Sequence, residues 1–216
     1  MRLIVATAIV ALAVTPAVAH RLDEYLQGTL ISIEKSRVQA EITLTPGVAV
    51  FPMLLKTIDV DRDGTISEGE KLAYAARVLR DLSLSIDGRS LTPRLLSTRF
   101  PAIDAMKEGR GEIRIEFDSD LPGGGPGRKL VLQNHHQSGI AAYQVNCLVP
   151  RDPDIKVVAQ KRNYTQSFYE LDYQQAGALS PQPLFIWPLG LRGAVIAVAI
   201  LLIARLGLLS RQLRYF

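Results

Sequence analysis

The sequence predicts a mainly β protein, an antiparallel β-sandwich with an inserted helix-loop-helix unit and a C-terminal transmembrane helix. Three observations lead to this prediction. Short runs rich in Ile, Leu, Val and Thr recur along the 216-residue chain, separated by turn residues at the intervals typical of sandwiches. Residues 51–82 instead have the helical spacing of apolar residues. An apolar segment near the C-terminus has the length that a membrane span needs.

Residues 1–19 have the pattern of a secretory signal peptide. Arg2 supplies the positive charge, residues 3–14 are apolar but too short to span a bilayer, and Ala17-Val18-Ala19 fits the small-residue cleavage pattern. We therefore expect the mature chain to begin at His20, on the extracytoplasmic (periplasmic) side of a cell membrane. The alternative is an uncleaved N-terminal anchor.

Residues 189–209 are predicted to form a single transmembrane helix. This stretch contains no acidic residue, and its two arginines, Arg192 and Arg205, lie near opposite ends, where their long side chains can reach the headgroups. A buried helix of a soluble domain would be amphipathic, whereas residues 193–204 are apolar all round. The pattern therefore favours the membrane.

Two further segments flank the predicted span. Residues 174–188 contain prolines and read as a linker, and residues 210–216 form a short tail. Arg211 and Arg214 in this tail are expected to hold it on the cytoplasmic side.

The net charge of +4 is a property of the two end segments. They hold five of the 25 basic residues and none of the 21 acidic ones, so the remaining chain carries 20 basic against 21 acidic residues. A near-neutral domain does not have the basic surface that nucleic-acid binding needs. We expect no nucleic-acid partner.

Residues 20–173 are predicted to form the extracytoplasmic sandwich domain. The clearest strand is 37–45, where four apolar residues alternate with polar ones. Pro93 interrupts the run at 91–100, and Asp87-Gly88 marks a turn. The predicted strands are 25–34, 37–45, 84–87, 91–100, 112–117, 129–134, 141–149, 154–160 and 166–173.

Two short helices are predicted within residues 51–82. The first, 51–58, has Pro52 in its first turn, where proline is well tolerated. The second, 68–82, repeats apolar residues at helical spacing. An acidic stretch, residues 59–70, joins them.

The acidic stretch has oxygen-bearing residues at the spacing of a calcium loop. Calcium takes six to eight oxygen ligands, and a 12-residue loop supplies them from positions 1, 3, 5, 7, 9 and 12, with a glycine at position 6. Gly64 occupies position 6, and Ile66 at position 8 is expected to pack beneath the loop. The predicted calcium ligands are Asp59, Asp61, Asp63, the carbonyl group of Thr65, Ser67 and Glu70.

Residues 51–82 therefore resemble the calmodulin-type EF-hand family. The resemblance implies one bound Ca²⁺ between two helices. A solvated acidic turn is the alternative, but it does not explain Gly64, Ile66 and Glu70 at their spacings. Magnesium prefers a tighter octahedral shell with several waters. In a calcium-rich extracytoplasmic compartment we expect the ion to be mainly structural, and a sensor role stays open if calcium varies there.

The three histidines suggest a second metal. A mature N-terminal His20 would offer its α-amine and its imidazole to copper, and His135 or His136 would supply a further nitrogen. This arrangement resembles the histidine brace of CopC proteins and lytic polysaccharide monooxygenases. A chance N-terminal histidine and a polar His-His loop are the alternative. Residues 19–26 also resemble the extracytoplasmic start of HupE/UreJ-type metal permeases, which implies a context of metal homeostasis.

Two function classes follow. The first is a non-enzymatic calcium-binding module that is anchored to the membrane and presents a scaffold to another envelope protein. The second is a copper-binding protein or oxidase with calcium as a stabiliser. The sequence has no nucleophile elbow, phosphate loop or zinc-protease motif, which favours the non-enzymatic class. Cys147, the single cysteine, lies on a predicted core strand and is expected to be a buried thiol.

Overall fold

The computed structural model describes residues 23–177. The predicted signal peptide, His20, most of the predicted linker, the predicted span and the tail lie outside the described residues. Within residues 23–177, no helix has both the length and the apolar character that crossing a membrane requires.

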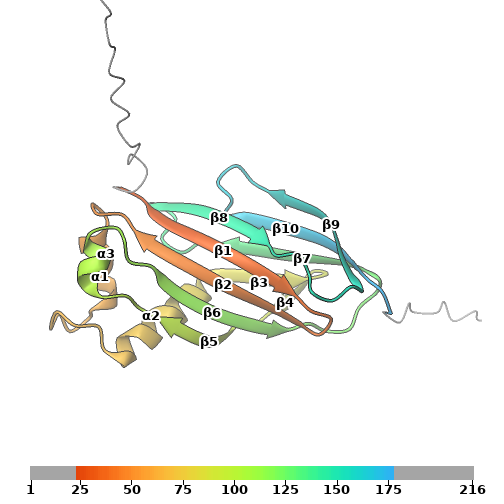
Figure 1. Ribbon diagram of the computed structural model, residues 1–216, viewed down its shortest axis with the longest axis horizontal. Coiled ribbons are helices and arrows are strands. Elements are labelled where there is room, and N and C mark those ends of the chain that lie inside the picture. Colours follow the sequence, from red (N-terminus) through yellow and green to blue (C-terminus); the bar gives the residue numbers. More distant parts are fainter. Residues whose placement is uncertain (1–22, 178–216) are drawn as a thin grey trace, which may run out of the picture. The chain divides into compact units, whose positions relative to one another are not determined.

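The described chain is mainly β, as predicted, and forms two five-stranded sheets (Figure 1). The first sheet has the strand order β5 (Arg94–Arg99), β6 (Ile113–Asp120), β2 (Arg37–Pro46), β1 (Tyr25–Ile33) and β8 (Ala141–Cys147). The second has the order β4 (Arg89–Leu91), β3 (Leu82–Ile86), β7 (Gly127–Asn134), β10 (Phe168–Gln175) and β9 (Ile155–Arg162).

The sheets differ from the prediction in two ways. Strands β1 and β8 run parallel, whereas the other paired strands are antiparallel, so the sandwich is not wholly antiparallel. The run predicted at 91–100 is divided into β4 and β5 on either side of Pro93, which cannot donate to a strand ladder. The described residues therefore contain ten strands, one more than expected.

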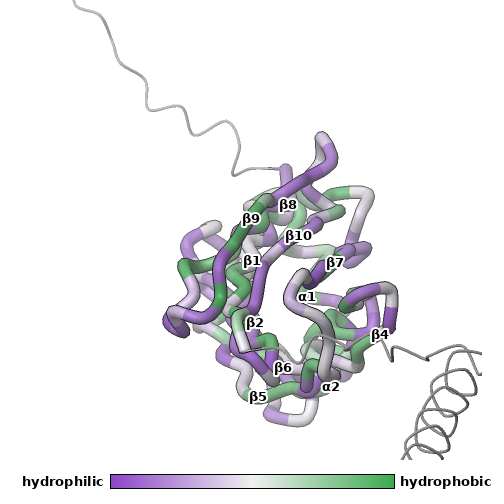
Figure 2. Tube along the Cα trace, turned by 90° about the vertical axis from the view of Figure 1, so that its right-hand side faces the viewer, coloured by the Kyte–Doolittle hydropathy of each residue, from purple (hydrophilic) through white to green (hydrophobic). Residues whose placement is uncertain are grey.

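Both sheets contribute to one apolar core. Along β2, buried and half-buried residues alternate from Arg37 to Pro46, as the sequence predicts for a strand with one face inward. Ile42 of the first sheet and Leu130 of the second are both fully buried in this core. Figure 2 shows hydrophobic stretches in green and hydrophilic stretches in purple along the strands.

Three helices, α1 (Phe51–Ile58), α2 (Glu68–Arg80) and α3 (Ile103–Lys107), lie together at one end of the sheets (Figure 1). The apolar face of α1 buries Phe51, Leu54 and Ile58. Helix α2 is two residues shorter than predicted, because Asp81 caps it and Leu82 already pairs with Asn134 in the second sheet.

The outer edge of β8 is covered by side chains of β9 and of the turn between β9 and β10. Arg162 donates from Nε to the carbonyl oxygen of Val145 at 2.8 Å and from Nη2 to Oδ1 of Asn146 at 2.7 Å. The amide of Val145 donates to Oε1 of Gln166 at 3.4 Å. The two bonds to Val145 satisfy backbone groups that an edge strand otherwise leaves free.

Candidate metal centre

The acidic loop joins the C-terminus of α1 to the N-terminus of α2, as the sequence predicts. Asp59 ends α1, and its amide donates to the carbonyl oxygen of Leu55 at 2.8 Å. Ser67 begins α2 with a capping box: its hydroxyl accepts from the amide of Glu70, and Oε2 of Glu70 accepts from the amide of Ser67. Both ends of the loop are therefore fixed by helix termini.

The loop brings three carboxylates together. One oxygen from each of Asp59, Asp61 and Asp63 lies within 4.8 Å of the others. Asp61 and Asp63 are exposed, whereas Asp59 is only 5% exposed, and its Oδ1 is buried without a hydrogen-bond partner. A buried acceptor without a partner costs about 1–3 kcal/mol. A cation would satisfy that oxygen.

Main-chain amides hold the carboxylates in place. The amide of Gly64 donates to Oδ2 of Asp59 at 3.2 Å, the amide of Asp63 to Oδ1 of Asp61 at 3.2 Å, and the amide of Thr65 to Oδ1 of Asp63 at 2.7 Å. Each bond occupies one oxygen of a carboxylate and leaves the other available to a ligand. Gly64 has a φ of +82°, the sharp turn expected of the sixth position.

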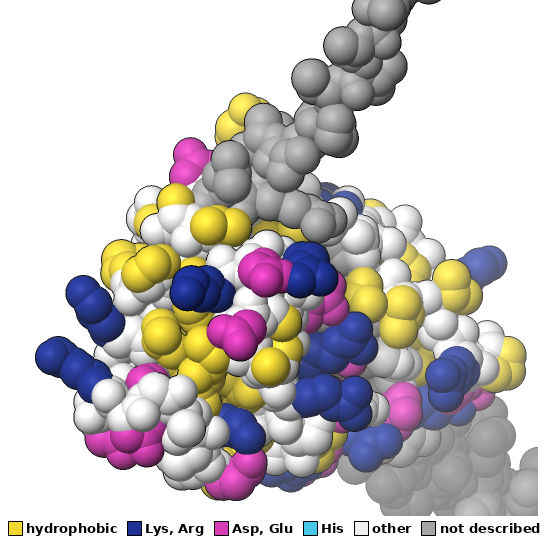
Figure 3. Space-filling view, turned by 60° about the vertical axis from the view of Figure 1, so that its left-hand side comes forward, with side chains coloured by type: hydrophobic (Ala, Val, Ile, Leu, Met, Phe, Trp, Pro, Cys, Tyr) yellow, Lys and Arg dark blue, Asp and Glu magenta, His cyan; other side chains and the backbone are white. Residues whose placement is uncertain are grey.

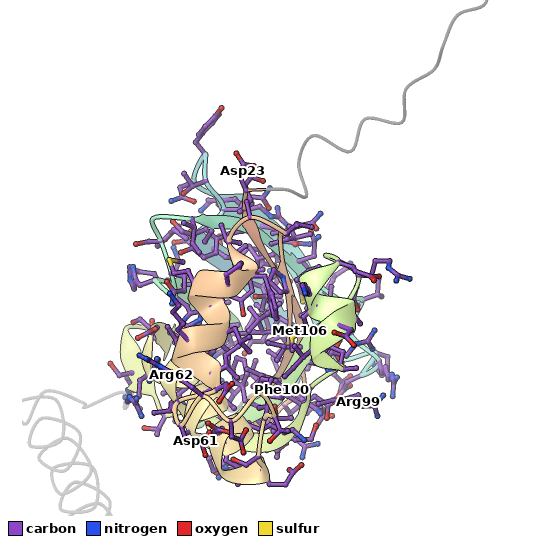
Figure 4. All side chains as sticks on the ribbon, turned by 90° about the vertical axis from the view of Figure 1, so that its left-hand side faces the viewer. Asp23, Asp61, Arg62, Arg99, Phe100 and Met106 are labelled. Atoms are coloured by element: carbon purple, nitrogen blue, oxygen red, sulfur yellow. The ribbon has the colours of Figure 1, made fainter. Side chains whose placement is uncertain are left out.

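Glu70, the twelfth loop residue, lies at the opposite end of the loop sequence but close to its start. Its Oε1 accepts a hydrogen bond from the amide of Val60 at 2.6 Å. Glu70 is not among the three carboxylates that approach within 4.8 Å. Ile66 is half-buried and packs against the core. Figure 4 views this end of the molecule, with Asp61 and Arg62 of the loop labelled.

The carboxylates of the loop influence one another. The amide of Asp63 lowers the pKa of Asp61, but desolvation and the charges of Asp63 and Glu70 outweigh it, so the pKa of Asp61 is raised. The amide and hydroxyl of Ser67 lower the pKa of Glu70. Glu70 is therefore ionised over the physiological range, and the Asp61 carboxylate lies in a negative environment.

The donor set fits a hard divalent cation. Carboxylates, a hydroxyl and a main-chain carbonyl are oxygen ligands, which calcium prefers. Asp59, Asp61, Asp63 and Glu70 would supply carboxylate oxygens, and Thr65 its carbonyl group. When bound, such an ion would neutralise the repulsion between these carboxylates.

The structure places the two described histidines differently, and His20 lies outside residues 23–177. His136 is 1% exposed, and both ring nitrogens have partners: Nδ1 lies 2.7 Å from Oδ2 of Asp81, and Nε2 lies 3.0 Å from the hydroxyl of Tyr74. His135 is exposed. Copper could bind the ring of His136 only by displacing Asp81 or Tyr74.

The sequence did not indicate the polar cluster around His136. Its partner Tyr74 lies 62 residues earlier in the chain, and Tyr25 extends the cluster through a bond of 2.7 Å between the two tyrosine hydroxyls. The one available signal was the spacing of Tyr74 on α2 and Asp81 at its C-cap, seven residues apart and hence on a similar face of the helix.

Cys147, predicted to be a buried thiol on a core strand, is only half-buried, because β8 is an edge strand of the first sheet. Its Sγ lies 3.2 Å from the carbonyl oxygen of Leu148. Burial raises the pKa of its thiol to about 11. At neutral pH the thiol is therefore protonated, which is the state expected of a structural cysteine.

Comparison with known proteins yields no relative. No protein-family model, no curated protein and no solved structure matches the chain. The case for a metal site therefore depends on the loop residues and their geometry.

Proposed function

We propose that residues 59–70 bind one calcium ion, in the manner of an EF-hand loop. The observation that carries this proposal is the state of Asp59. Its carboxylate is buried at the start of the loop, one of its oxygens has no hydrogen-bond partner, and oxygens of Asp61 and Asp63 lie within 4.8 Å. A buried anion beside two further anions is unfavourable unless a cation is bound.

The ion has a mainly structural role in this proposal. The loop connects α1 and α2, and both helices pack their apolar faces into the core of the sandwich. An ion held by Asp59 and Glu70 therefore links the end of one helix to the start of the next. Extracellular calcium modules bind at about 10⁻⁴–10⁻³ M, which keeps a site occupied where calcium is abundant.

The domain acts, in this proposal, as a membrane-anchored module that presents a surface to another envelope protein. The predicted signal peptide and the predicted span at 189–209 support the anchoring. The near-neutral charge outside the end segments supports a protein partner over a nucleic acid. On the face shown in Figure 3, Lys and Arg are interspersed with Asp and Glu and with exposed hydrophobic side chains.

Calorimetric titration of the full-length chain with CaCl₂ and with MgCl₂ tests the calcium proposal. We expect one calcium per chain and a much weaker response to magnesium, because the loop offers more oxygens than the octahedral shell of Mg²⁺ uses. The absence of calcium binding at millimolar concentration contradicts the proposal.

Fractionation of cells that express the chain tests the anchoring. The full chain should remain with the membrane after high-salt washing and enter solution only in detergent. A chain truncated after Gly177 should be released with the soluble extracytoplasmic proteins. Release of the full chain by salt alone contradicts the predicted span.

A further inference from the structure

The imidazole of His136 makes two of the hydrogen bonds that connect helix α2 and its cap to the sheets. His136 follows β7, and both of its ring nitrogens have a partner on the α2 side. Nε2 lies 3.0 Å from the hydroxyl of Tyr74 on α2, and Nδ1 lies 2.7 Å from Oδ2 of Asp81, the C-cap of α2. The Tyr74 hydroxyl also lies 2.7 Å from the hydroxyl of Tyr25 on β1. Tyr25, Tyr74 and His136 are each no more than 1% exposed.

The main chain of His136 is itself fixed by both sheets. Its amide donates to Oδ1 of Asn134 at 2.9 Å, and its carbonyl oxygen accepts from Nε2 of Gln27 at 2.9 Å and from the hydroxyl of Tyr143 at 3.0 Å. Asn134 and Gln27 are also bonded to each other at 2.9 Å. Buried polar networks whose members all have partners are rigid, because no group can move without losing a bond. The imidazole ring is therefore held rigidly by the sheets, and its bonds to Tyr74 and Asp81 hold α2 in position.

The same helix carries the last residue of the proposed calcium loop. Glu70 and Tyr74 are four residues apart on α2 and so lie on one side of the helix, one turn from each other. We propose that Tyr74 and His136 are positioning residues of the calcium site, which hold α2 so that Glu70 meets the carboxylates of the loop. This inference rests on the proposed calcium binding.

The need for such a support follows from the geometry of the loop. The carboxylate of Asp59 is held by α1, whose buried residues Phe51, Leu54 and Ile58 anchor it in the core. Glu70 is held by α2. Calcium–oxygen distances are about 2.3–2.6 Å, so a shift of α2 by roughly one ångström removes a ligand. The position of α2 relative to α1 therefore sets the affinity.

The direction of the hydrogen bonds gives the network a dependence on pH. An ionised Asp81 only accepts, so Nδ1 of neutral His136 carries the proton and Nε2 accepts from the hydroxyl of Tyr74. Tyr25 then donates to Tyr74. Protonation of Nε2 reverses both bonds and leaves the buried hydroxyl of Tyr25 without an acceptor among the bonds of the described residues.

The groups that face the His136 ring come from three elements. Asp81 and Arg77 lie at the end of α2, Tyr74 lies on the same helix, Tyr25 lies on β1, and Tyr143 on β8 contacts the main chain of His136. Burial lowers the pKa of His136, and Arg77 acts in the same direction, while Asp81 opposes them. The net effect keeps the ring neutral at pH 7.

The experiment is a calcium titration of the full-length chain and two variants at pH 7.5. Tyr74→Phe removes the hydroxyl that binds His136. Tyr173→Phe is the matched control, since Tyr173 is equally buried but its hydroxyl has no hydrogen-bond partner among the described residues. We expect the calcium affinity of Tyr74→Phe to be roughly three- to tenfold weaker, because part of the free energy of one buried hydrogen bond is lost from the site. We expect no change in the calcium affinity of Tyr173→Phe. Equal affinity in both variants overturns the inference.

A pH series separates positioning from general destabilisation. Protonation of the loop carboxylates affects every variant, whereas reversal of the Tyr74–His136 bond affects only chains that have the Tyr74 hydroxyl. The ratio of calcium dissociation constants at pH 5.5 and pH 7.5 should therefore be larger in the wild type than in Tyr74→Phe. The same ratio in both proteins overturns the inference.

A second pair of variants covers the case in which Tyr74→Phe does not fold. Asp81 has a side chain that is 39% exposed, so it tolerates substitution better. Asp81→Ala removes the bond to Nδ1 and should weaken calcium binding, whereas Asp81→Asn retains an acceptor for Nδ1 and should restore it. Equal affinity in Asp81→Ala and the wild type overturns the inference. If the wild type binds no calcium, the proposed function itself fails. If the wild type binds calcium and Asp59→Asn does not, the calcium site stands. In that case, a Tyr74→Phe variant with the calcium affinity of the wild type refutes only the positioning role.

Discussion

The amide of Val60 donates a hydrogen bond of 2.6 Å to Oε1 of Glu70, ten residues further along the chain. This bond joins the second and the twelfth residues of the acidic loop and so closes the loop into a ring. A ring of this kind is already ordered before an ion arrives, which lowers the conformational entropy that binding must overcome. The two ends of the proposed calcium loop are therefore ordered in advance, whereas Glu70 is not among the carboxylates whose oxygens lie within 4.8 Å of one another.

Asp59→Asn should abolish the stabilisation that calcium gives. A ligand at 10–100 times its dissociation constant stabilises the folded state by about 1.4–2.7 kcal/mol, which raises the melting temperature of a domain of this size by roughly 3–10 °C. Thermal unfolding in calcium and in chelator measures the difference. In chelator, Asp59→Asn should be at least as stable as the wild type, because the substitution removes one of three neighbouring charges. Asp104→Asn is the control, since Asp104 is an exposed residue of α3 and not part of the loop sequence. An equal calcium response in Asp59→Asn and the control contradicts the site.

Glu70→Gln should separate the capping role of Glu70 from its role as a ligand. Glutamine still accepts from the amide of Ser67, so the capping box is retained. It lacks the charge and the bidentate geometry that calcium needs at position 12. We expect unfolding in chelator to be nearly unchanged and calcium affinity to fall by more than tenfold. Glu68→Gln, two residues earlier on the exposed side of α2, should bind calcium as the wild type does.

Gly64→Ala should destabilise the domain even without calcium. The φ of Gly64 is +82°, and a side chain in the left-handed region costs about 1–2 kcal/mol. A Cβ at this position would meet no atom within 4 Å, so the expected cost arises from backbone strain and not from a clash. Urea unfolding in chelator measures it. Gly125→Ala, also in open space but without a positive φ, should change the free energy of unfolding much less.

Acidification should destabilise the domain through His136. Burial lowers the pKa of His136 below its ordinary value of 6.5, so the unfolded chain binds a proton more readily than the folded one. The stability from this group is complete above pH 6.5 and is lost as the pH falls through the folded pKa, at about 1.4 kcal/mol for each unit of the shift. Urea unfolding in chelator at pH 7.5 and pH 5.5 should show a larger loss for the wild type than for His136→Gln, which cannot be protonated. Identical losses in the two proteins would mean that His136 does not contribute.

Cys147 should react slowly with thiol reagents in the folded protein. Its pKa is raised to about 11 by burial, and only the thiolate is nucleophilic. At pH 8 roughly one thiol in a thousand is then ionised, so alkylation by iodoacetamide should be far slower than in urea. Mass spectrometry of timed samples checks this. Comparable rates in the two solvents would show that the thiol is open to solvent.

Local patterns were sufficient to predict much of the fold. The bounds of α1 at residues 51–58 agree with the prediction, because Pro52 and the apolar spacing mark both its start and its face. The alternation along residues 37–45 predicts β2 and its buried side. The positions of Gly64 and Ile66 agree with the predicted loop, since both depend on spacing within a short segment.

The remaining features depend on contacts between distant segments. The parallel pairing of β1 with β8 joins Tyr25 to Ala141, and no periodicity in either strand specifies a partner more than a hundred residues away. The hydrogen bonds of His136 to Tyr74 and Asp81 likewise join residues that are more than fifty positions apart in the chain. A histidine pair in a polar stretch gives no indication that one ring is buried and the other exposed, because tertiary packing decides it.

The side chains along the outer edge of β8 have a consequence for how the protein behaves when crowded. Arg162 and Gln166 occupy main-chain groups of Val145 that would otherwise recruit a strand from a neighbouring molecule. Growth of the first sheet into a fibre through this edge would have to remove a charged guanidinium from its carbonyl partner. A domain that is concentrated on a surface is thereby given resistance to sheet-by-sheet aggregation on this side, and the resistance is built from side chains of β9 and of the turn that follows it.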